Sequence, residues 1–387
     1  MYHGSNHRTV AISAGRTGTI DSIETDFWVI KYLGSKRTIL PRLMVAIRSL
    51  EGVSSVLDAF SGTSRVGYEL KKNGYQVFSN DINTYAHILA QCHVEAEANS
   101  TLGTATQLIE ELNQLSGKHG YITETYCINS RFFQPQNGEK IDAIRDKIDT
   151  WQLSPTLKAI CLTALIEAAD RVDSTTGIQM AYLKQWAKRS YKPLQLRLPA
   201  MLNAAANRPC QSYQLDALAA ADTIPADCAY LDPPYNQHSY LGNYHIWESI
   251  VRWDQPEVYG IACKRIDCKQ NKSDFNSKPK ALPTFTDLIS RLRTPNLIVS
   301  FNNEGFIDRS SMEKLLSEKG HLQTIELDYK RYVGAQIGIH NPEGDRTGVV
   351  SHLRNKEYIY IVTTKPLKTA MMSSIAAAPT SSKRIAV

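Results

Sequence analysis

Short apolar runs bounded by polar turns predict the strands of this chain. The runs "SSVLDAF" (54–60) and "YQVFSNDIN" (75–83) flank "SGTSRVGYELKKNG" (61–74), which is typical of a turn followed by a helix that stops at Gly74. A strand, a helix and a second strand in this order predict a parallel sheet. The strand pattern returns in "DCAYLDPPY" (227–235), "TPNLIVSFNN" (294–303), "HLQTIELDY" (321–329) and "NKEYIYIVTT" (355–364). The last two runs are expected to form a hairpin.

Apolar residues at helical spacing dominate the stretch between the early and the late strands. The segments "EKIDAIRDKIDTW" (139–151), "PTLKAICLTALIEAADRV" (155–172) and "AYLKQWAKR" (181–189) are amphipathic at the helical period. We therefore predict an α/β protein with a mainly helical insert. The expected divisions are a flexible N-terminal arm at 1–26, a catalytic sheet domain at 27–85 plus 211–365, the insert at 86–210, and a disordered tail at 366–387.

Composition narrows the function classes. The chain has 387 residues, of which 42% are hydrophobic and 21% charged, and this is ordinary for a globular protein with a buried core. Seven scattered cysteines without a CxxC pair predict neither a zinc site nor a disulfide framework, and they fit a reduced cytoplasm. No run of 18 apolar residues occurs, so no membrane span is expected. We expect a cytoplasmic monomer without a metal, and the net charge of +6 favours a polyanionic partner.

The stretch "LDPPY" (231–235) places an acid and an aromatic ring directly after an apolar run. The two prolines end the strand, because neither can donate to a ladder, and they hold Asp232 at the lip of the sheet. The Asp232 carboxylate and the Pro233 carbonyl are two acceptors for the two hydrogens of an aromatic amine, and Tyr235 can stack on the base. Such bonding localises the amine lone pair for attack on a methyl group. A base in a duplex would first have to leave the stack.

Two further stretches suit a nucleoside cofactor. Gly62 lies between a strand and a helix, where the missing Cβ lets a ligand approach the backbone. Asp81 ends the next strand, which is where doubly wound folds hold ribose hydroxyls. No GxGxxG motif is present, so pyrophosphate binding is not expected. In "KYLGSK" (31–36), two lysines flank a glycine turn before a helix, and this arrangement suits a carboxylate.

The order "KYLGSK", "DAFSGT", a long insert and "DPPY" resembles the Dam-like α group of DNA adenine-N6 methyltransferases. The resemblance covers about 31–365 and implies a Rossmann-like S-adenosylmethionine-dependent sheet with the insert as target-recognition region. It implies that Lys36 binds the methionine end of the cofactor and Asp81 the ribose. The implied cofactor-binding residues are Tyr32, Lys36, Asp58, Phe60, Gly62, Thr63, Asp81, Ile82, Asp216 and Asp232; the implied catalytic residues are Asp232, Pro233, Pro234 and Tyr235.

The same resemblance implies double-stranded DNA as substrate and, for a restriction-modification enzyme, a cognate restriction endonuclease as partner. It implies that "NLIVSFNNEGF" (296–306) lies near the target base and that the late hairpin carries a DNA-facing loop. Basic residues interleaved with aromatic ones suggest phosphate contacts. The residues expected to bind DNA are Lys184, Lys188, Arg189, Lys264, Arg265, Lys269 and Arg331.

Three alternatives are open at this point. The same chemistry could act on RNA, or on N4 of cytosine, although the cytosine enzymes usually carry Ser where this chain has Asp232. Protein-glutamine methyltransferases resemble the motif but carry Asn there. A catalytically silent methyltransferase fold could also bind DNA without chemistry, but the intact run from Asp232 to Tyr235 argues against it.

Overall fold

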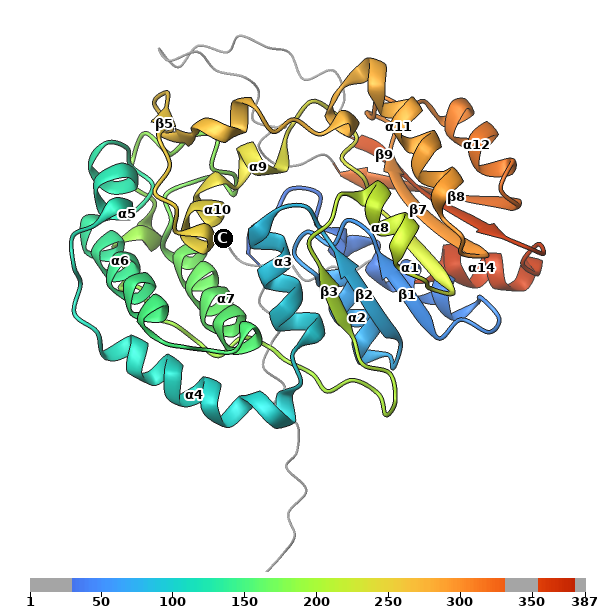
Figure 1. Cartoon of the computed structure of the whole chain (residues 1–387). Helices are drawn as coiled ribbons and strands as arrows, with labels where there is room; N and C mark the ends of the chain where they lie inside the picture. The colour runs from blue at the N-terminus through green and yellow to red at the C-terminus, as the bar shows by residue number, and fades with distance from the viewer. Residues whose placement is uncertain (1–29, 331–353, 380–387) are drawn as a thin grey trace, which may run out of the picture.

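The computed structural model describes residues 30–330 and 354–379 (Figure 1). The expected N-terminal arm (1–26), Arg331 and most of the predicted DNA-facing loop lie outside the described residues. Figure 1 shows a sheet domain on the right and a helical lobe on the left.

A seven-stranded sheet forms the sheet domain, and the α/β fold class is confirmed. Its spatial order is β3 (Gln211–Tyr213), β2 (Gln76–Asn80), β1 (Ser55–Asp58), β4 (Cys228–Leu231), β7 (Asn296–Asn302), β9 (Arg354–Thr363) and β8 (His321–Lys330). The first five strands are parallel, whereas β9 is antiparallel to both of its neighbours. The predicted hairpin is confirmed, with Ile325 of β8 opposite Ile359 of β9.

Side chains of the central strands alternate between two buried faces, which is why these strands appear as continuous apolar runs. Leu57, Ala229 and Leu297 belong to the cluster on one face, and Val56 and Ile298 to the cluster on the other. The first face is covered by α8 (Ala217–Thr223), α11 (Lys278–Arg291) and α12 (Arg309–Ser317), and the second by α1 (Leu40–Arg48), α2 (Arg65–Lys72) and α14 (Thr369–Ala377).

Helix α14 corrects the prediction of a disordered tail, which is wrong for residues 369–377. Ile375 is fully buried in the core, and the Arg42 Nε of α1 donates to the Ala376 carbonyl at 3.3 Å. The segment consists mostly of small residues, so its sequence gave no clear sign of the apolar face that packs on the sheet domain. The segment is therefore part of the fold.

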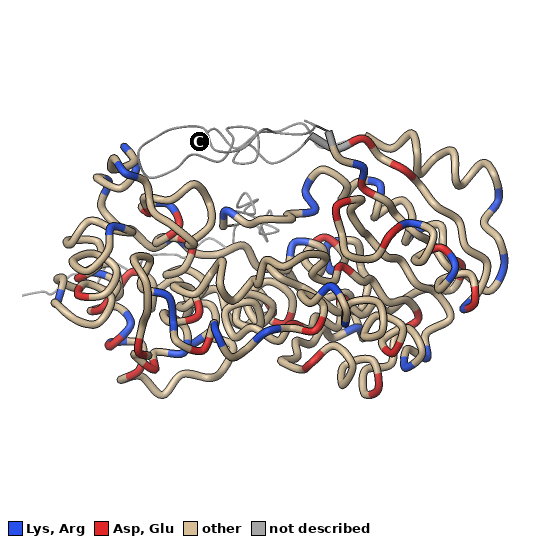
Figure 2. The backbone as a smooth tube through the Cα atoms, turned by 90° about the horizontal axis from the view of Figure 1, so that it is seen from above, with Lys and Arg blue, Asp and Glu red and all other residues tan. Residues whose placement is uncertain are grey.

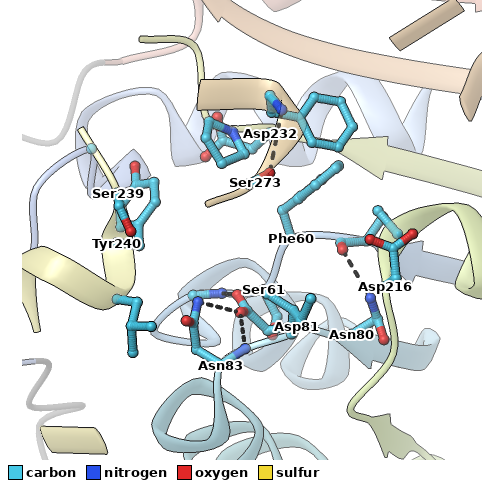
Figure 3. A pocket seen from close by; sticks show the side chains of 18 of the residues that line it. Phe60, Ser61, Asn80, Asp81, Asn83, Asp216, Asp232, Ser239, Tyr240 and Ser273 are labelled. Carbon is cyan, nitrogen blue, oxygen red and sulfur yellow. Dashed lines mark hydrogen bonds between the residues drawn. The ribbon is translucent and has the colours of Figure 1, made fainter. Parts of the chain in front are cut away.

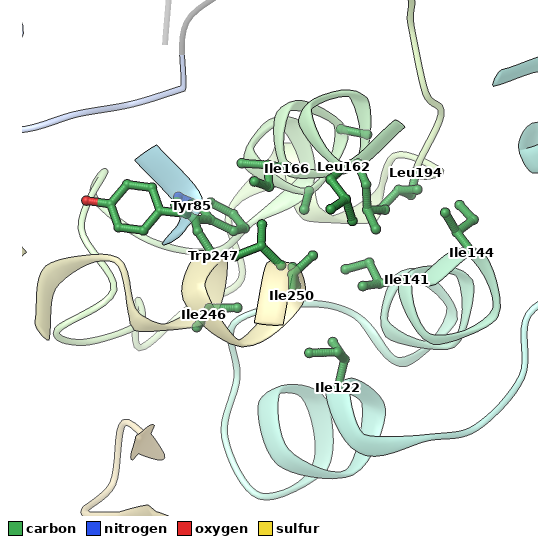
Figure 4. Close-up of a cluster of buried hydrophobic side chains, with 14 of the residues drawn as sticks. Tyr85, Ile122, Ile141, Ile144, Leu162, Ile166, Leu194, Ile246, Trp247 and Ile250 are labelled. Carbon is green, nitrogen blue, oxygen red and sulfur yellow. The ribbon is translucent and has the colours of Figure 1, made fainter. Parts of the chain in front are cut away.

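The helical lobe is assembled from two separate stretches of chain. The first stretch begins two residues before the expected insert, with α3 (Thr84–Ala90). The insert itself supplies α4 (Ala98–Gln114), α5 (Tyr121–Thr123), α6 (Pro135–Thr150), α7 (Pro155–Val172) and the π-helical turns Gln91–Glu95 and Glu124–Ile128. After β4 the chain returns to the lobe with α9 (Tyr240–Asn243) and α10 (His245–Arg252). Trp247 and Ile250 of α10 pack in one core with Ile141 and Leu162 (Figure 4). The lobe thus extends beyond 86–210.

The predicted helix at 181–189 is wrong, because only the short turn Lys188–Tyr191 is helical there. Ser174 holds this segment in an extended path instead: its carbonyl accepts from the Leu183 N–H at 2.9 Å, and its hydroxyl from the Ala187 N–H at 3.1 Å. Tertiary hydrogen bonds therefore override the helical spacing.

The remaining elements connect the lobe to the sheet. They are the 3-10 turns Lys36–Thr38, Ile266–Lys269 and Asp274–Asn276 and the two-stranded hairpin of β5 (Val258–Tyr259) and β6 (Lys264–Arg265). Over the described ranges, no helix is both long and apolar enough to span a membrane.

Candidate active site

A cavity of about 730 Å³ opens at the carboxyl ends of the parallel strands, between the sheet domain and the helical lobe (Figure 3). From β1 the chain proceeds to β2 on one side, and from β4 to β7 on the other, so a crevice forms where the strand order reverses. The size is typical of a cofactor site. All ten residues that the sequence suggested for cofactor binding line it: Tyr32, Lys36, Asp58, Phe60, Gly62, Thr63, Asp81, Ile82, Asp216 and Asp232.

The loop after β1 is held against the end of β2 by Asp81. Gly62 has φ +51° and donates its N–H to Asp81 Oδ2 at 3.0 Å. A Cβ at Gly62 would lie 3.1 Å from the Tyr32 hydroxyl, so glycine is needed both for the turn and for the space. Asp81 Oδ1 accepts from the N–H and the side-chain amide of Asn83 at 2.9 and 3.0 Å (Figure 3). Burial raises the pKa of Asp81, and these hydrogen bonds lower it.

Asp58 is a buried carboxylate that points to a missing cationic partner. It lines the cavity, is 1% exposed, and neither side-chain oxygen has a hydrogen-bond partner of ordinary geometry among the described residues. Burial, together with the negative charges of Asp232 and Asp81, raises the pKa of Asp58 to about 8, although the Gly67 N–H acts in the opposite direction. An unpaired buried carboxylate is costly, and an ammonium group in the cavity would satisfy it.

The cavity also offers apolar surfaces that suit a flat nucleobase. Phe60 packs edge-on against Phe275, with ring centroids 5.4 Å apart. Ile82 is 61% exposed at the cavity wall, which leaves an apolar side chain available to a ligand. Asp216 accepts from the Leu218 N–H at 2.9 Å and so caps α8 at the same wall. A nucleoside with an ammonium group, as in S-adenosylmethionine, therefore fits this set of residues.

Asp232 lies at the centre of a partly buried ionic cluster. Lys36 Nζ is 2.9 Å from Asp232 Oδ1 and 3.0 Å from Glu357 Oε1. The Ser300 hydroxyl donates to the same Asp232 Oδ1 at 3.2 Å, and it lies 2.8 Å from the Tyr230 hydroxyl. The two donors thus approach one oxygen of the carboxylate from two different elements.

Burial and charge act in opposite directions in this cluster. Burial raises the pKa of Asp232 to about 6; the Lys36 ammonium lowers it, and the Glu357 carboxylate raises it. Burial opposes the charged form of Lys36, but Asp232 and Glu357 outweigh that penalty, and the pKa of Lys36 lies well above its usual value. Lys36 is therefore a cation bound by two carboxylates in this structure, rather than one held ready for a cofactor carboxylate alone.

The rest of "DPPY" is fixed by the loop after β7. Pro233 is buried and Pro234 lines the cavity. The Tyr235 carbonyl accepts from the Phe306 N–H at 2.8 Å, and the Tyr235 ring packs edge-on against Phe301 with centroids 6.0 Å apart. The predicted loop "NLIVSFNNEGF" therefore lies beside the motif.

Sequence reasoning placed Ser300 only within a segment expected near the target base, and it did not single out Glu357 or the segment 270–276, which forms one wall of the cavity. Asn276 of that segment donates to the Asn236 carbonyl at 2.7 Å and so ties the wall to the loop after "DPPY". The one available signal was the polar start of the run "KEYIYIV", where an acid precedes a strongly apolar strand.

Some of the basic residues expected to contact DNA are exposed, whereas others contact side chains of the protein itself. Lys184, Lys188 and Lys269 are exposed. Arg265 is fully buried and bonded to Asp254 and Asp267, so its assignment to DNA is wrong. The Arg189 guanidinium is bound to Asp173 at 2.8 Å, and Lys264 Nζ lies 3.3 Å from the Met180 sulfur. Figure 2 shows Lys and Arg mixed with Asp and Glu over both halves of the molecule.

The fold and the site define the class of protein. A family model for the D12 class of N6 adenine-specific DNA methyltransferases matches residues 32–300, from the loop before α1 to the strand that carries Ser300. The chain belongs to this family, whose members use S-adenosylmethionine as methyl donor. It is therefore an adenine-N6 DNA methyltransferase. Within the described residues, no group of three His, Cys, Asp or Glu side chains could hold a metal ion.

Three similar proteins from bacteria are named as methyltransferases or modification methylases. The type II methyltransferase M.NlaIII of Neisseria lactamica is 30% identical over 341 residues, which cover 85% of this chain and all of that protein. Modification methylase StsI of Streptococcus sanguinis is 30% identical and the type II methyltransferase M.FokI of Planomicrobium okeanokoites 29% identical, each over 328 residues. These matches cover 80% and 78% of this chain and half of each relative.

Proposed function

We propose that Asp232, Pro233 and Tyr235 perform the methyl transfer on an adenine that has flipped out of duplex DNA into the cavity. The observation that carries this proposal is the position of Asp232: it lies at the carboxyl edge beside the cavity, with one carboxylate oxygen bonded and fixed by Lys36 and Ser300. A carboxylate held in this way is a preorganised acceptor.

The chain's own residues would make the adenine amine nucleophilic. The lone pair of N6 is delocalised into the ring, so the amine is a poor nucleophile. The Asp232 carboxylate accepts one N–H and the Pro233 carbonyl the other, which localises the lone pair on nitrogen. The Tyr235 ring stacks on the extruded base. S-adenosylmethionine would supply an electrophilic methyl group on a sulfonium, whose sulfur keeps the electron pair of the broken C–S bond and leaves as a neutral thioether. N6 forms the new C–N bond and loses one proton to water.

Several cavity residues are proposed to hold the cofactor. Asp81 accepts from the ribose hydroxyls, and Phe60 and Ile82 provide the apolar surfaces for the adenine ring. The buried Asp58 carboxylate accepts from the ammonium of the methionine end, which supplies the cation that it lacks. Tyr32, Gly62, Thr63 and Asp216 complete the wall, and Lys36 contributes a positive charge near the cofactor carboxylate.

A direct test of this function uses DNA from cells that express the chain. Single-molecule sequencing should show N6-methyladenine in one short sequence context, and the same cells with Asp232→Ala should show none. Methylated cytosine, or unmethylated adenine despite folded protein, would count against the proposal. Because the relatives are named type II methyltransferases and modification methylases, we also propose a cognate restriction endonuclease that cuts this context. The monomeric state and the cytoplasmic location remain predictions.

The helical lobe is proposed to contact DNA phosphates through Lys184 and Lys188. Both are exposed and close to Trp186 in sequence: Lys184 lies in the extended segment that follows α7, and Lys188 begins the short turn Lys188–Tyr191. Replacing both by glutamine should flatten the dependence of log Kd on log salt by about one for each lost phosphate contact. Filter binding to a duplex at several salt concentrations measures the slope.

A matched control separates contact from general charge. Lys118 and Lys158 also lie in the lobe, but their ammonium groups are bound at 2.8 Å to Asp146 and Asp149. Replacing these two by glutamine removes the same charge and should leave the slope unchanged. Equal slopes for both double variants would show that Lys184 and Lys188 do not contact phosphates.

A further inference from the structure

The antiparallel strand β9 brings an acid to the active site from the far end of the chain. Because β9 runs opposite to its neighbour β7, its first residues reach the carboxyl edge where the cavity opens. Glu357 is the fourth residue of β9 and pairs with Asn302, the last residue of β7.

Glu357 is buried and its carboxylate is fully engaged. It is 5% exposed; its Oε1 lies 3.0 Å from Lys36 Nζ, and its Oε2 accepts from the Asn302 side-chain amide at 3.4 Å. The side chain of Lys36 is itself only 10% exposed. The lysine is thus held between two carboxylates: that of Asp232, which directly follows β4, and that of Glu357 on β9.

This arrangement occupies one oxygen of Asp232. Lys36 Nζ and the Ser300 hydroxyl both bond to Oδ1, so Oδ2 is the oxygen that neither of them uses. We propose that Glu357 is a positioning residue for methyl transfer: it anchors Lys36 on Asp232 Oδ1 and balances its charge, so that Oδ2 stays a strong acceptor for the target amine. The inference rests on the role proposed above for Asp232.

The charge balance gives the inference a specific consequence. With Glu357 neutral, the Lys36 ammonium interacts with Asp232 alone and stabilises its ionised form more strongly. The carboxylate then titrates at lower pH, and its oxygens attract an N–H less well. The plateau rate should therefore fall, and the acid limb of the pH profile should shift to lower pH.

The other titratable groups around Asp232 do not produce this signature. The tyrosine hydroxyls near it have raised pKa values and stay neutral, and burial raises the pKa of Asp58. These groups do not change between the variants. The titratable and charged groups facing Asp232 and its immediate neighbours are Lys36, Asp58, Tyr230, Tyr235, Tyr240, Glu304 and Glu357.

The test is the single-turnover methylation rate of Glu357→Gln between about pH 5 and pH 9, measured with saturating S-adenosylmethionine and duplex DNA. We expect the plateau rate to fall about tenfold or more, as for a lost bond to a charged group, and the acid limb to shift to lower pH. A matched control is Glu326→Gln on the same hairpin, where the exposed acid binds Arg309 and Lys356 instead. This variant should retain the profile of the wild type.

Two outcomes overturn the inference in distinguishable ways. If Glu357→Gln has a lower melting temperature but the rate and pH limb of the wild type, Glu357 supports only the fold. If Asp232→Ala keeps the wild-type rate in the same assay, the proposed role of Asp232 fails first, and the inference falls with it. A lower, shifted profile for Glu357→Gln beside an inactive Asp232→Ala supports both.

Discussion

Replacing Asp232 by alanine is expected to remove nearly all methyl transfer while leaving S-adenosylmethionine binding within a few-fold of the wild type. The substitution deletes one of two acceptors for the target amine, and losing a preorganised contact of this kind costs about 3–4 kcal/mol in the barrier, or roughly 10²–10³-fold in rate. Cofactor binding should survive, because Asp58, Phe60 and Asp81 surround the other part of the cavity. Single-turnover rates and calorimetry measure the two effects separately.

The pH dependence of the wild type follows from the same group. Asp232 accepts an N–H only when it is ionised, and burial raises its pKa to about 6. The single-turnover rate should therefore rise with pH through about 6 and fall as the carboxylate is protonated below it. Tyr235→Phe is a suitable control, because it retains the ring and leaves Asp232 untouched; it should keep most of the rate and the same acid limb.

The second large effect is expected at Asp81. Asp81→Ala should weaken S-adenosylmethionine binding by about 1–3 kcal/mol, roughly 5- to 150-fold in Kd, because it removes charge-assisted bonds to the ribose. Isothermal titration calorimetry measures this change directly. An affinity equal to that of the wild type would show that the ribose is held elsewhere.

Asp81 also accepts hydrogen bonds from Gly62 and Asn83, so the experiment needs a variant that loosens this local network and keeps the carboxylate. Asn83→Ala removes one of the donors to Asp81 Oδ1 and leaves the carboxylate in place. It should weaken binding much less than Asp81→Ala. Equal losses in both variants would mean that Asp81 acts through this local network and does not contact the ribose.

The sequence predicted those parts of the site that follow a strand directly. Asp58, Gly62, Asp81 and Asp232 each lie at or just after the end of a parallel strand, so alternation and turn chemistry place them at one edge of the sheet. Glu357 could not be predicted in this way. Its position depends on the antiparallel pairing of β9 with β7, which joins residues far apart in the chain.

Charge and spacing alone were poor guides where tertiary contacts decide. Arg265 has the same sequence signature as an exposed phosphate contact, yet Asp254 and Asp267 bury it in an ion-pair network. The segment at 181–189 has helical spacing, but Ser174 accepts hydrogen bonds from the backbone N–H groups of Leu183 and Ala187. In the tail, the low-complexity composition predicted disorder, although Ile375 of α14 is buried.

The most direct test of the central claim identifies where the methyl group goes. Purified wild type and Asp232→Ala are incubated with a mixed duplex DNA pool and methyl-labelled S-adenosylmethionine, and the DNA is digested to nucleosides. If Asp232 activates the target amine, the wild type should place label only in N6-methyladenine, and the variant should place almost none despite retained cofactor binding. Label in a methylated cytosine, or wild-type label in N6-methyladenine from Asp232→Ala, would contradict it.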